Sequence, residues 1–293
     1  MECGKMARSA FLLITLALLA SSTVKADSLL RFAVPASDCA CNPALQDPFE
    51  NPIRFGYGQF AGLCVNTCHF RAVHQLGNSA KHFRFNNLYH DYKYWIADLD
   101  NSKIEYADIL LERFTVGVDH VMLRLHLAKD SPAILSSQTQ ANTNTFTNDI
   151  ILSIEGVPPK GVQGHLWEGM RGSYLLVYRA LSLFQIADWA IKKHHHPIRQ
   201  FRLNIDKNNL EQILERAMRE SEKKSFQEAY YLFSENCATN AISLTETPSY
   251  LNFEEGFSGP LPLFNTVHAL IRKAKIDETT KLLNLEEELG IPL

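Results

Sequence analysis

The chain has 293 residues, a formal net charge of −3 and a hydrophobic fraction of 46%. This length suits one large domain or a domain with an appended module. The slightly acidic balance argues against a nucleic-acid partner, which would call for a basic surface.

The first 26 residues have the three parts of a secretory signal peptide. Lys5 and Arg8 precede an apolar run at 11–20, and Ala26 supplies a small residue at the expected cleavage site. The apolar run is shorter than the roughly 20 residues that a membrane-spanning helix needs. An uncleaved N-terminal anchor is the alternative. We therefore expect residues 1–26 to be removed, and the protein to be bacterial and periplasmic or secreted.

Four cysteines lie close together in the region that follows, residues 27–113. In an oxidising compartment they should form two disulfides. A bridge between Cys39 and Cys41 would close a strained ring, so each should pair with Cys64 or Cys68, and both pairings stay open. Zinc is the competing interpretation, but the CxC…CxxxC spacing is not a usual zinc pattern, and we expect no bound metal. This region is therefore predicted to be a small disulfide-tied module.

The run 114–128 is the clearest strand in the sequence. Its alternation places Val121, Leu123, Leu125 and Leu127 on one face, and His120, Met122, Arg124 and His126 on the other. His120 and His126 would lie about 20 Å apart, so only one of them can serve a given site. For either, a histidine on a partly solvated sheet face is the commoner alternative.

Helices are predicted further along the chain. One helical pattern, 174–191, must stop before Pro197, and His194, His195 and His196 are expected at its solvated end. A second helix begins after Asp206, with apolar residues at helical spacing: Leu210, Ile213, Leu214, Ala217 and Met218. The tail, residues 251–293, is expected to hold helices at 266–274 and 278–289, the second ended by Gly290.

Cys237 is the cysteine left without an evident disulfide partner. Asn236 is a favourable N-cap, and the residues from Ala238 to Thr245 follow helical spacing until Pro248. Cys237 would then occupy the first helical position, where unpaired N–H groups and the helix dipole favour a thiolate. Two interpretations stay open at this point: a nucleophile, or a buried cysteine that fills space at a helix start.

Several motifs, taken together in order, carry a resemblance. They are DHVMLRL (119–125), LSIEGVPPKGVQGHLWEGMRGSY (152–174), and IRQFRLNID (198–206) followed by YYLFSENCA (230–238). This set resembles the Lnb N-terminal periplasmic domain family, bacterial envelope proteins named after a lipoprotein N-acyltransferase. The likeness covers residues 114–247. It implies an α+β, circularly permuted papain-like fold for a core at 114–250, with Cys237 as nucleophile and His120, rather than His126, as its base.

A third side chain should orient the imidazole of such a base. Glu155 is the candidate, because it lies on the strand DIILSIE that follows His120 in the sequence. Capping of the turn at 156–159 is the alternative role for this carboxylate. Asn236 and the backbone N–H of Cys237 are expected to position the site and to stabilise an oxyanion.

These parts fit an exported cysteine-dependent acyltransferase, or a lipid or acyl hydrolase, of the cell envelope that forms an acyl-thioester on Cys237 and needs no cofactor. The expected partners are an envelope lipid, a lipoprotein or a peptide, with peripheral membrane contact. The alternatives are a thiol peptidase or amidase of peptidoglycan or protein, and a non-catalytic envelope binding module. Trp167, Tyr230 and Tyr231 would line an acyl-chain groove, although aromatics beside a helix more often belong to a core.

Overall fold

A computed structural model describes residues 39–41, 51–78, 82–115, 118–138, 143–164, 168–169, 171–231, 236–245, 276–277 and 282–293. The expected signal peptide at 1–26, Trp167 and the helix expected at 266–274 lie outside these residues.

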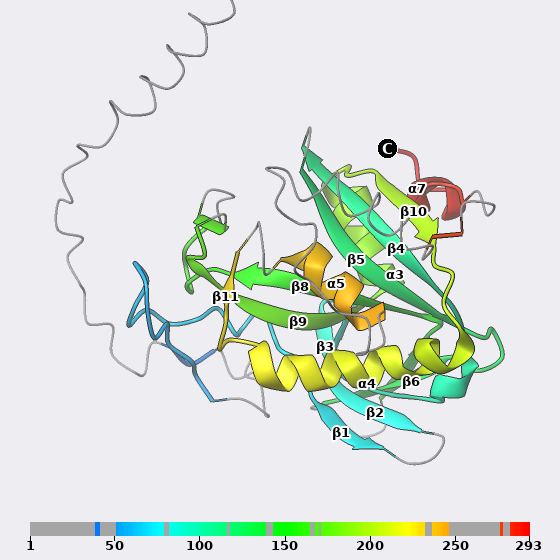
Figure 1. Cartoon of the computed structure of the whole chain (residues 1–293), viewed down its shortest axis with the longest axis horizontal. Helices are drawn as coiled ribbons and strands as arrows, with labels where there is room; N and C mark the ends of the chain where they lie inside the picture. The colour runs from blue at the N-terminus through cyan, green and yellow to red at the C-terminus, as the bar shows by residue number, and fades with distance from the viewer. Residues whose placement is uncertain are drawn as a thin grey trace, which may run out of the picture. The chain divides into compact units, whose positions relative to one another are not determined.

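The described residues form an α+β fold built on one mixed sheet (Figure 1). Its strands run in the order β10-β4-β5-β8-β9-β2-β3-β6-β7, with β1 paired to β2 and β11 paired to β9. The pairing of β2 with β9 is parallel, and the other strand pairs are antiparallel. The strands are β1 (Gln75–Asn78), β2 (Phe83–His90), β3 (Lys93–Leu99), β4 (Ile104–Thr115), β5 (Val118–Leu127), β6 (Ala133–Ser137), β7 (Asn144–Thr147), β8 (Asp149–Val157), β9 (Tyr174–Ser182), β10 (Ile198–Arg202) and β11 (Ala229–Tyr230).

Helices cover both faces of this sheet. On one face, α4 (Lys207–Lys224) and α5 (Cys237–Thr245) pack on the apolar side of β5 and its neighbours. On the other face, α3 (Leu183–Ile186), the π-helical η4 (Ala187–Lys193) and α7 (Leu285–Glu288) pack on a second apolar cluster. A short 3-10 helix, η3 (Asn101–Lys103), precedes β4.

The alternation predicted for β5 is confirmed, but its bounds differ. Val121, Leu123, Leu125 and Leu127 all belong to the core beneath α4 and α5, and Met122 belongs to the opposite cluster. The expected single strand over 114–128 is wrong at its start, because β4 ends at Thr115 and β5 begins at Val118. Phe114 therefore sits at the end of one strand of a hairpin and His120 near the start of the next.

The helix expected from residue 174 is a strand over its first half. All nine residues of β9 are buried, and the strand lies between β8 and β2 in the interior of the sheet. A continuous apolar run that is buried on both faces has no alternation to separate it from a buried helix. The helical turns begin only at Leu183, where the Ser182 side chain accepts a hydrogen bond from the backbone N–H of Gln185.

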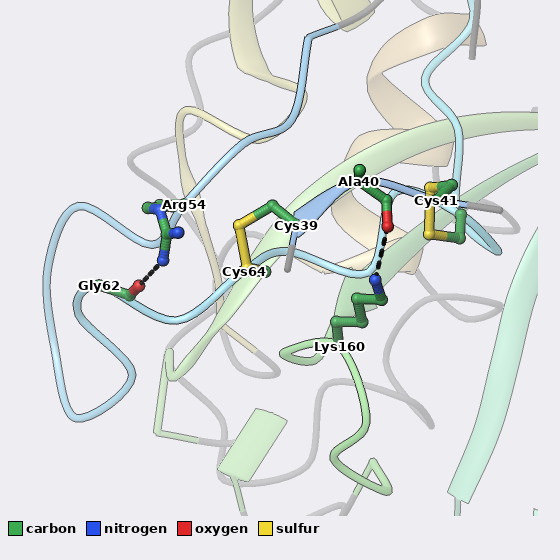
Figure 2. Close-up of a disulfide and its surroundings, with 8 residues drawn as sticks. Cys39, Ala40, Cys41, Arg54, Gly62, Cys64 and Lys160 are labelled. Atoms are coloured by element: carbon green, nitrogen blue, oxygen red, sulfur yellow. Dashed lines mark hydrogen bonds between the residues drawn. A yellow bond between two sulfur atoms is a disulfide. The ribbon is translucent and has the colours of Figure 1, made fainter. Parts of the chain in front are cut away.

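The two disulfides near the N-terminus confirm the predicted arrangement and select one pairing. Cys39 bonds to Cys64, and Cys41 bonds to Cys68 (Figure 2). The cross-linked segment also contacts the turn after β8, where Lys160 donates from Nζ to the carbonyl of Ala40 at 2.8 Å. The bridges thus tie the N-terminal segment to the end of the strand that carries Glu155.

The expected boundary between the N-terminal module and the core, at residues 113 and 114, does not separate two sheets. Strands from both sides of it belong to the same sheet. That boundary falls inside β4, and β2, from the expected N-terminal module, pairs with β9 from the expected core. The C-terminal helix α7 is shorter than expected and begins at Leu285. Gly290 follows it with a φ of +64°, as predicted for a residue that ends a helix.

Candidate active site

Cys237 occupies the first position of α5. The Asn236 side-chain oxygen accepts hydrogen bonds from the backbone N–H groups of Ala238, at 2.8 Å, and Thr239, at 2.9 Å. This is the N-cap that the sequence predicted. The thiol is 2% exposed and is the free cysteine of the described part of the chain. Through these two hydrogen bonds the Asn236 side chain positions the start of α5.

The sulfur lies where β5 and β8 part. The two strands pair from His126 opposite Asp149 as far as Met122 opposite Ser153, and their pairing ends there. Just beyond this point, the backbone N–H of Val121 donates to Sγ of Cys237 at 3.5 Å. Helix α5 packs against both strands (Figure 1). Its N-terminus brings the thiol next to Val121, the residue that follows His120.

His120 and Cys237 are electrostatically coupled and have opposite shifts in their pKa values. Burial alone lowers the pKa of His120, but the charge of the Cys237 thiolate, the hydrogen bond to it and the nearby carboxylates of Glu155 and Glu112 raise it to about 9. Burial alone raises the pKa of Cys237, and the charge and hydrogen bond of His120, with the Val121 N–H and the Tyr230 hydroxyl, lower it overall. The pair therefore favours an imidazolium and a thiolate near neutral pH.

Ser153 connects the imidazole to Glu155. His120 Nε2 lies 2.8 Å from Oγ of Ser153, which donates to Oε1 of Glu155 at 2.9 Å. Because the hydroxyl proton points to Glu155, Oγ accepts from Nε2–H and leaves Nδ1 to face the sulfur. Glu155 thus reaches the imidazole through Ser153 and not directly, and no cap of the 156–159 turn is among its described hydrogen bonds.

Arg179 forms an ion pair with the second carboxylate oxygen of Glu155. Its Nη1 donates to Oε2 at 2.7 Å, from the neighbouring strand β9. Burial alone raises the pKa of Glu155, but the charges of Arg179 and His120 and the hydrogen bonds from Arg179 and Ser153 lower it overall. The carboxylate therefore stays ionised and supports a protonated His120. Ser153 and Arg179 were missed from the sequence, although Ser153 stands two residues before Glu155 on the same strand face.

Tyr230 contributes its hydroxyl to the site, beyond the apolar surface expected of it. The backbone N–H of Cys237 donates to this hydroxyl at 3.5 Å, which brings the hydroxyl close to the thiol. Burial and the charge of Cys237 hold the pKa of Tyr230 well above its usual value, so it remains a donor. Gly156 makes room for the ring, because a Cβ there would lie 3.0 Å from Cδ1 of Tyr230. Tyr231, by contrast, is 43% exposed and lies outside the set of residues that line the cavity.

A cavity of about 590 Å³ opens beside the sulfur. Its polar lining includes Cys237, His120, Glu155, Arg179 and Glu112, while the rest is mainly aromatic and aliphatic. The aromatic and aliphatic lining side chains are Phe70, Tyr89, Tyr92, Phe114, Met122, Tyr174, Leu181, Ile186, Trp189 and Tyr230. The cavity has the size and the mixture of apolar walls and few polar groups that small-molecule sites show.

Comparison with known proteins identifies the family. A family model of the Lnb N-terminal periplasmic domain matches residues 91–273. The chain belongs to this family. Comparison with curated proteins and with solved structures gives no match. The match to the Lnb family begins at the turn between β2 and β3, earlier than the motifs had indicated, so it takes in β3 and β4 as well.

Membership in the Lnb family makes the protein periplasmic or secreted. Across the residues that the structure describes, we find no helix with the length and apolar character needed to cross a membrane. Within the same residues, no group of three or more His, Cys, Asp and Glu side chains is arranged to hold a metal ion. In the histidine run at 194–196, Nδ1 of His196 lies 2.7 Å from Oε1 of Glu112.

The Arg of the Lnb-like His-x-x-x-Arg strand, Arg124, lies away from the sulfur. It donates from Nε to Asp149 at 2.7 Å and from Nη2 to Glu288 at 3.0 Å. His126 also contacts Asp149, at 2.8 Å, and stacks on Tyr106. The structure therefore separates the two histidines of β5: His120 pairs with the thiol, and His126 belongs to a network that fastens α7 to the sheet.

Proposed function

We propose that the protein is a cysteine-dependent acyltransferase, or a lipid or acyl hydrolase, of the cell envelope that acts through an acyl-thioester on Cys237. The observation that carries this proposal is the position of Cys237 beside the His120–Val121 end of β5, with both Cys237 and His120 lining one largely apolar cavity. A thiolate held by an imidazolium is the activated nucleophile of acyl transfer. Apolar walls around it suit a hydrocarbon chain attached to the reacting carbonyl.

The first half-reaction forms the thioester. The Cys237 thiolate attacks the carbonyl carbon of an ester, a C–S bond forms, and the carbonyl oxygen becomes an oxyanion. The backbone N–H of Cys237 and the hydroxyl of Tyr230 supply the two donors for that oxyanion. As the tetrahedral intermediate collapses, the bond to the alcohol breaks, and the imidazolium of His120 gives its proton to the leaving oxygen.

The second half-reaction regenerates the thiolate. An amine or a water molecule attacks the thioester carbonyl, neutral His120 takes the proton from this nucleophile, and the C–S bond breaks. An amine acceptor makes the protein a transferase, and water makes it a hydrolase. Throughout, Ser153 and Glu155 keep Nδ1 of the imidazole directed at the sulfur, and Glu155 stabilises the imidazolium.

The arrangement of these groups supports a circularly permuted papain-like core as part of the same proposal. The histidine strand β5 precedes the nucleophile helix α5 in the chain, and α5 packs against the sheet with its N-terminus at the histidine. Fold alone does not distinguish acyl esters from peptides as substrates. The apolar lining of the cavity is the observation that favours the acyl group.

An acyl adduct on Cys237 tests the proposal. The protein is incubated with a diacyl phospholipid, and its intact mass is measured before and after treatment with neutral hydroxylamine, which cleaves thioesters. We expect one hydroxylamine-sensitive acyl adduct in the wild type and none in Cys237→Ser or His120→Ala. His126→Ala is the matched control, since this residue shares the strand and the face with His120 but lies away from the sulfur, and it should form the adduct. Failure of the wild type to form an adduct with any acyl ester, together with cleavage of a peptide substrate, would favour the peptidase alternative.

A further inference from the structure

Three aromatic side chains form a rim around the cavity beside Cys237. Tyr92 comes from the turn between β2 and β3, Phe114 from the end of β4, and Trp189 from η4. All three line the cavity, yet they remain 42%, 44% and 41% exposed, respectively. Large apolar side chains from three separate segments that gather at one opening and stay in water mark an interaction site. We refer to Tyr92, Phe114 and Trp189 as the aromatic rim.

The helical segment 183–193 extends the rim. One side of it is buried on the sheet through Ile186, Ala190 and Ile191. Phe184, in the same segment, is 47% exposed and contacts the ring of His90. The segment thus has apolar side chains on its buried side and aromatic side chains on its solvent side. Packing on the sheet accounts for the first set and not for the exposed aromatic side chains.

Basic side chains lie near two members of the aromatic rim in the sequence. Lys192 and Lys193 follow Trp189 and are exposed, and Lys193 pairs with Asp188. Arg113 precedes Phe114, and Arg113 and Arg199 are both about half exposed. The carboxylate between the two arginines, Asp119, accepts from both of them. Asp119 balances one of the two arginines and Asp188 one of the two lysines, so each pair keeps one positive charge in excess.

We infer that the aromatic rim and its cations dock the protein on an anionic phospholipid bilayer, with the cavity mouth facing the lipid. Trp and Tyr prefer the headgroup level of a membrane, and exposed lysines and arginines gain from an anionic surface. This combination suits a lipid surface better than a protein surface, where exposed lysine is depleted at the contact. Docking would let an acyl chain pass from the bilayer into the cavity, a role that rests on the proposed function. The docking itself does not depend on chemistry at Cys237.

Vesicle sedimentation tests the docking. The mature protein is mixed with large vesicles of equal parts phosphatidylcholine and phosphatidylglycerol, or of phosphatidylcholine alone. We expect binding to the anionic vesicles, weakened at least about tenfold in the double variant Phe114→Ser/Trp189→Ser, because both lose buried apolar area at the interface. Lys192→Glu/Lys193→Glu should weaken binding to the anionic vesicles and leave the weaker binding to phosphatidylcholine unchanged.

Two controls separate docking from folding and from catalysis. Phe146→Ser removes an aromatic that is 59% exposed on β7 and does not line the cavity, so it should bind as the wild type does. Cys237→Ser should also bind fully, which distinguishes a failure of the acyl chemistry from a failure of docking. The inference is overturned if the wild type does not sediment with anionic vesicles, or if the rim variant binds as tightly as Phe146→Ser does. Trp189 fluorescence should shift to the blue on binding, whereas Trp95 is buried and should not respond.

Discussion

The backbone N–H of Val121 donates to the sulfur of Cys237 at 3.5 Å. Val121 directly follows His120 in β5, so the strand that supplies the imidazole also supplies a main-chain donor to the thiol. Together with the packing of α5 against β5, this contact fixes the distance between strand and helix at this point. The backbone therefore brings His120 close to Cys237.

The first prediction concerns the pH dependence of thiol reactivity. The pKa of Cys237 is lowered and that of His120 is raised to about 9, so the thiolate and imidazolium coexist between the two values. Alkylation by iodoacetamide should therefore have its midpoint below the pKa of about 8.5 of an ordinary cysteine. His120→Ala removes the stabilising charge and should move the midpoint of the alkylation rate to higher pH. An unchanged midpoint in that variant would contradict the ion pair, and His126→Ala supplies the control.

The sequence predicted the nucleophile end of the site because local rules govern it. An N-cap and helical spacing place Cys237 at the start of α5, and the two-residue period of β5 separates His120 from the core side chains. These signals depend only on residues that are close in the sequence. They therefore predict the local structure without any knowledge of how the helix and the strand pack in the fold.

The rest of the site depends on the register between strands, which a single sequence does not contain. Ser153 reaches His120 only because β5 and β8 pair as they do, and Glu112 stands opposite His120 only through the β4–β5 hairpin. The hydroxyl of Tyr230 meets the sulfur because β11 pairs with β9. The same limit explains β9, whose fully buried run carries no periodicity to tell strand from helix.

The second prediction is that Ser153→Ala uncouples Glu155 from the base. Loss of the hydroxyl leaves Nε2 of His120 without its acceptor and weakens the hold on the imidazolium. Acyl transfer should fall by about 10- to 100-fold, less than on loss of the general base itself. The apparent pKa of His120 should fall as well, read from the pH profile of the rate. Ser153→Thr keeps the hydroxyl and should restore most of the activity, whereas a purely structural role would show no such rescue.

Glu155→Gln is the less informative variant for this purpose. It would leave the buried guanidinium of Arg179 without its carboxylate, and breaking a buried ion pair costs about 3–5 kcal/mol of stability. A loss of activity there would not be separable from a loss of fold. Ser153→Ala avoids this cost because Arg179 keeps its partner.

The third prediction assigns Tyr230 to the oxyanion. Tyr230→Phe removes one of two donors and should lower kcat by about 100-fold with little change in KM. The hydroxyl also donates to the thiolate, so the alkylation midpoint of Cys237 should rise in the same variant. Tyr231→Phe is the matched control, since the neighbouring ring is exposed and does not line the cavity. Equal effects of the two substitutions would remove Tyr230 from the mechanism.

The fourth prediction concerns the disulfides. The Cys41–Cys68 bridge closes a loop with a sequence separation of 27, and its removal in Cys41→Ser/Cys68→Ser should cost about 3 kcal/mol in the free energy of unfolding. The cross-linked segment contacts the turn after β8, through the bridge pair of Val65 and Pro159. Urea unfolding with and without reductant measures the loss, and reductant should have a smaller effect on the double variant than on the wild type.

The last prediction is the pH range over which α7 stabilises the sheet. Burial raises the pKa of Glu288, but hydrogen bonds from Arg124 and Gln200 and the charge of Arg124 lower it overall. A carboxyl whose pKa is lower in the folded state adds stability above its unfolded pKa of about 4.3, and this stability is lost as the pH falls through the folded value. Glu288→Gln should therefore lower Tm at pH 7, and the difference from the wild type should shrink as the pH falls below 4. Glu220→Gln, on the partly exposed face of α4, should show a much smaller difference at pH 7 because its lysine contacts are surface pairs. A pH-independent difference at Glu288 would mean that the side chain acts through packing and not through its charge.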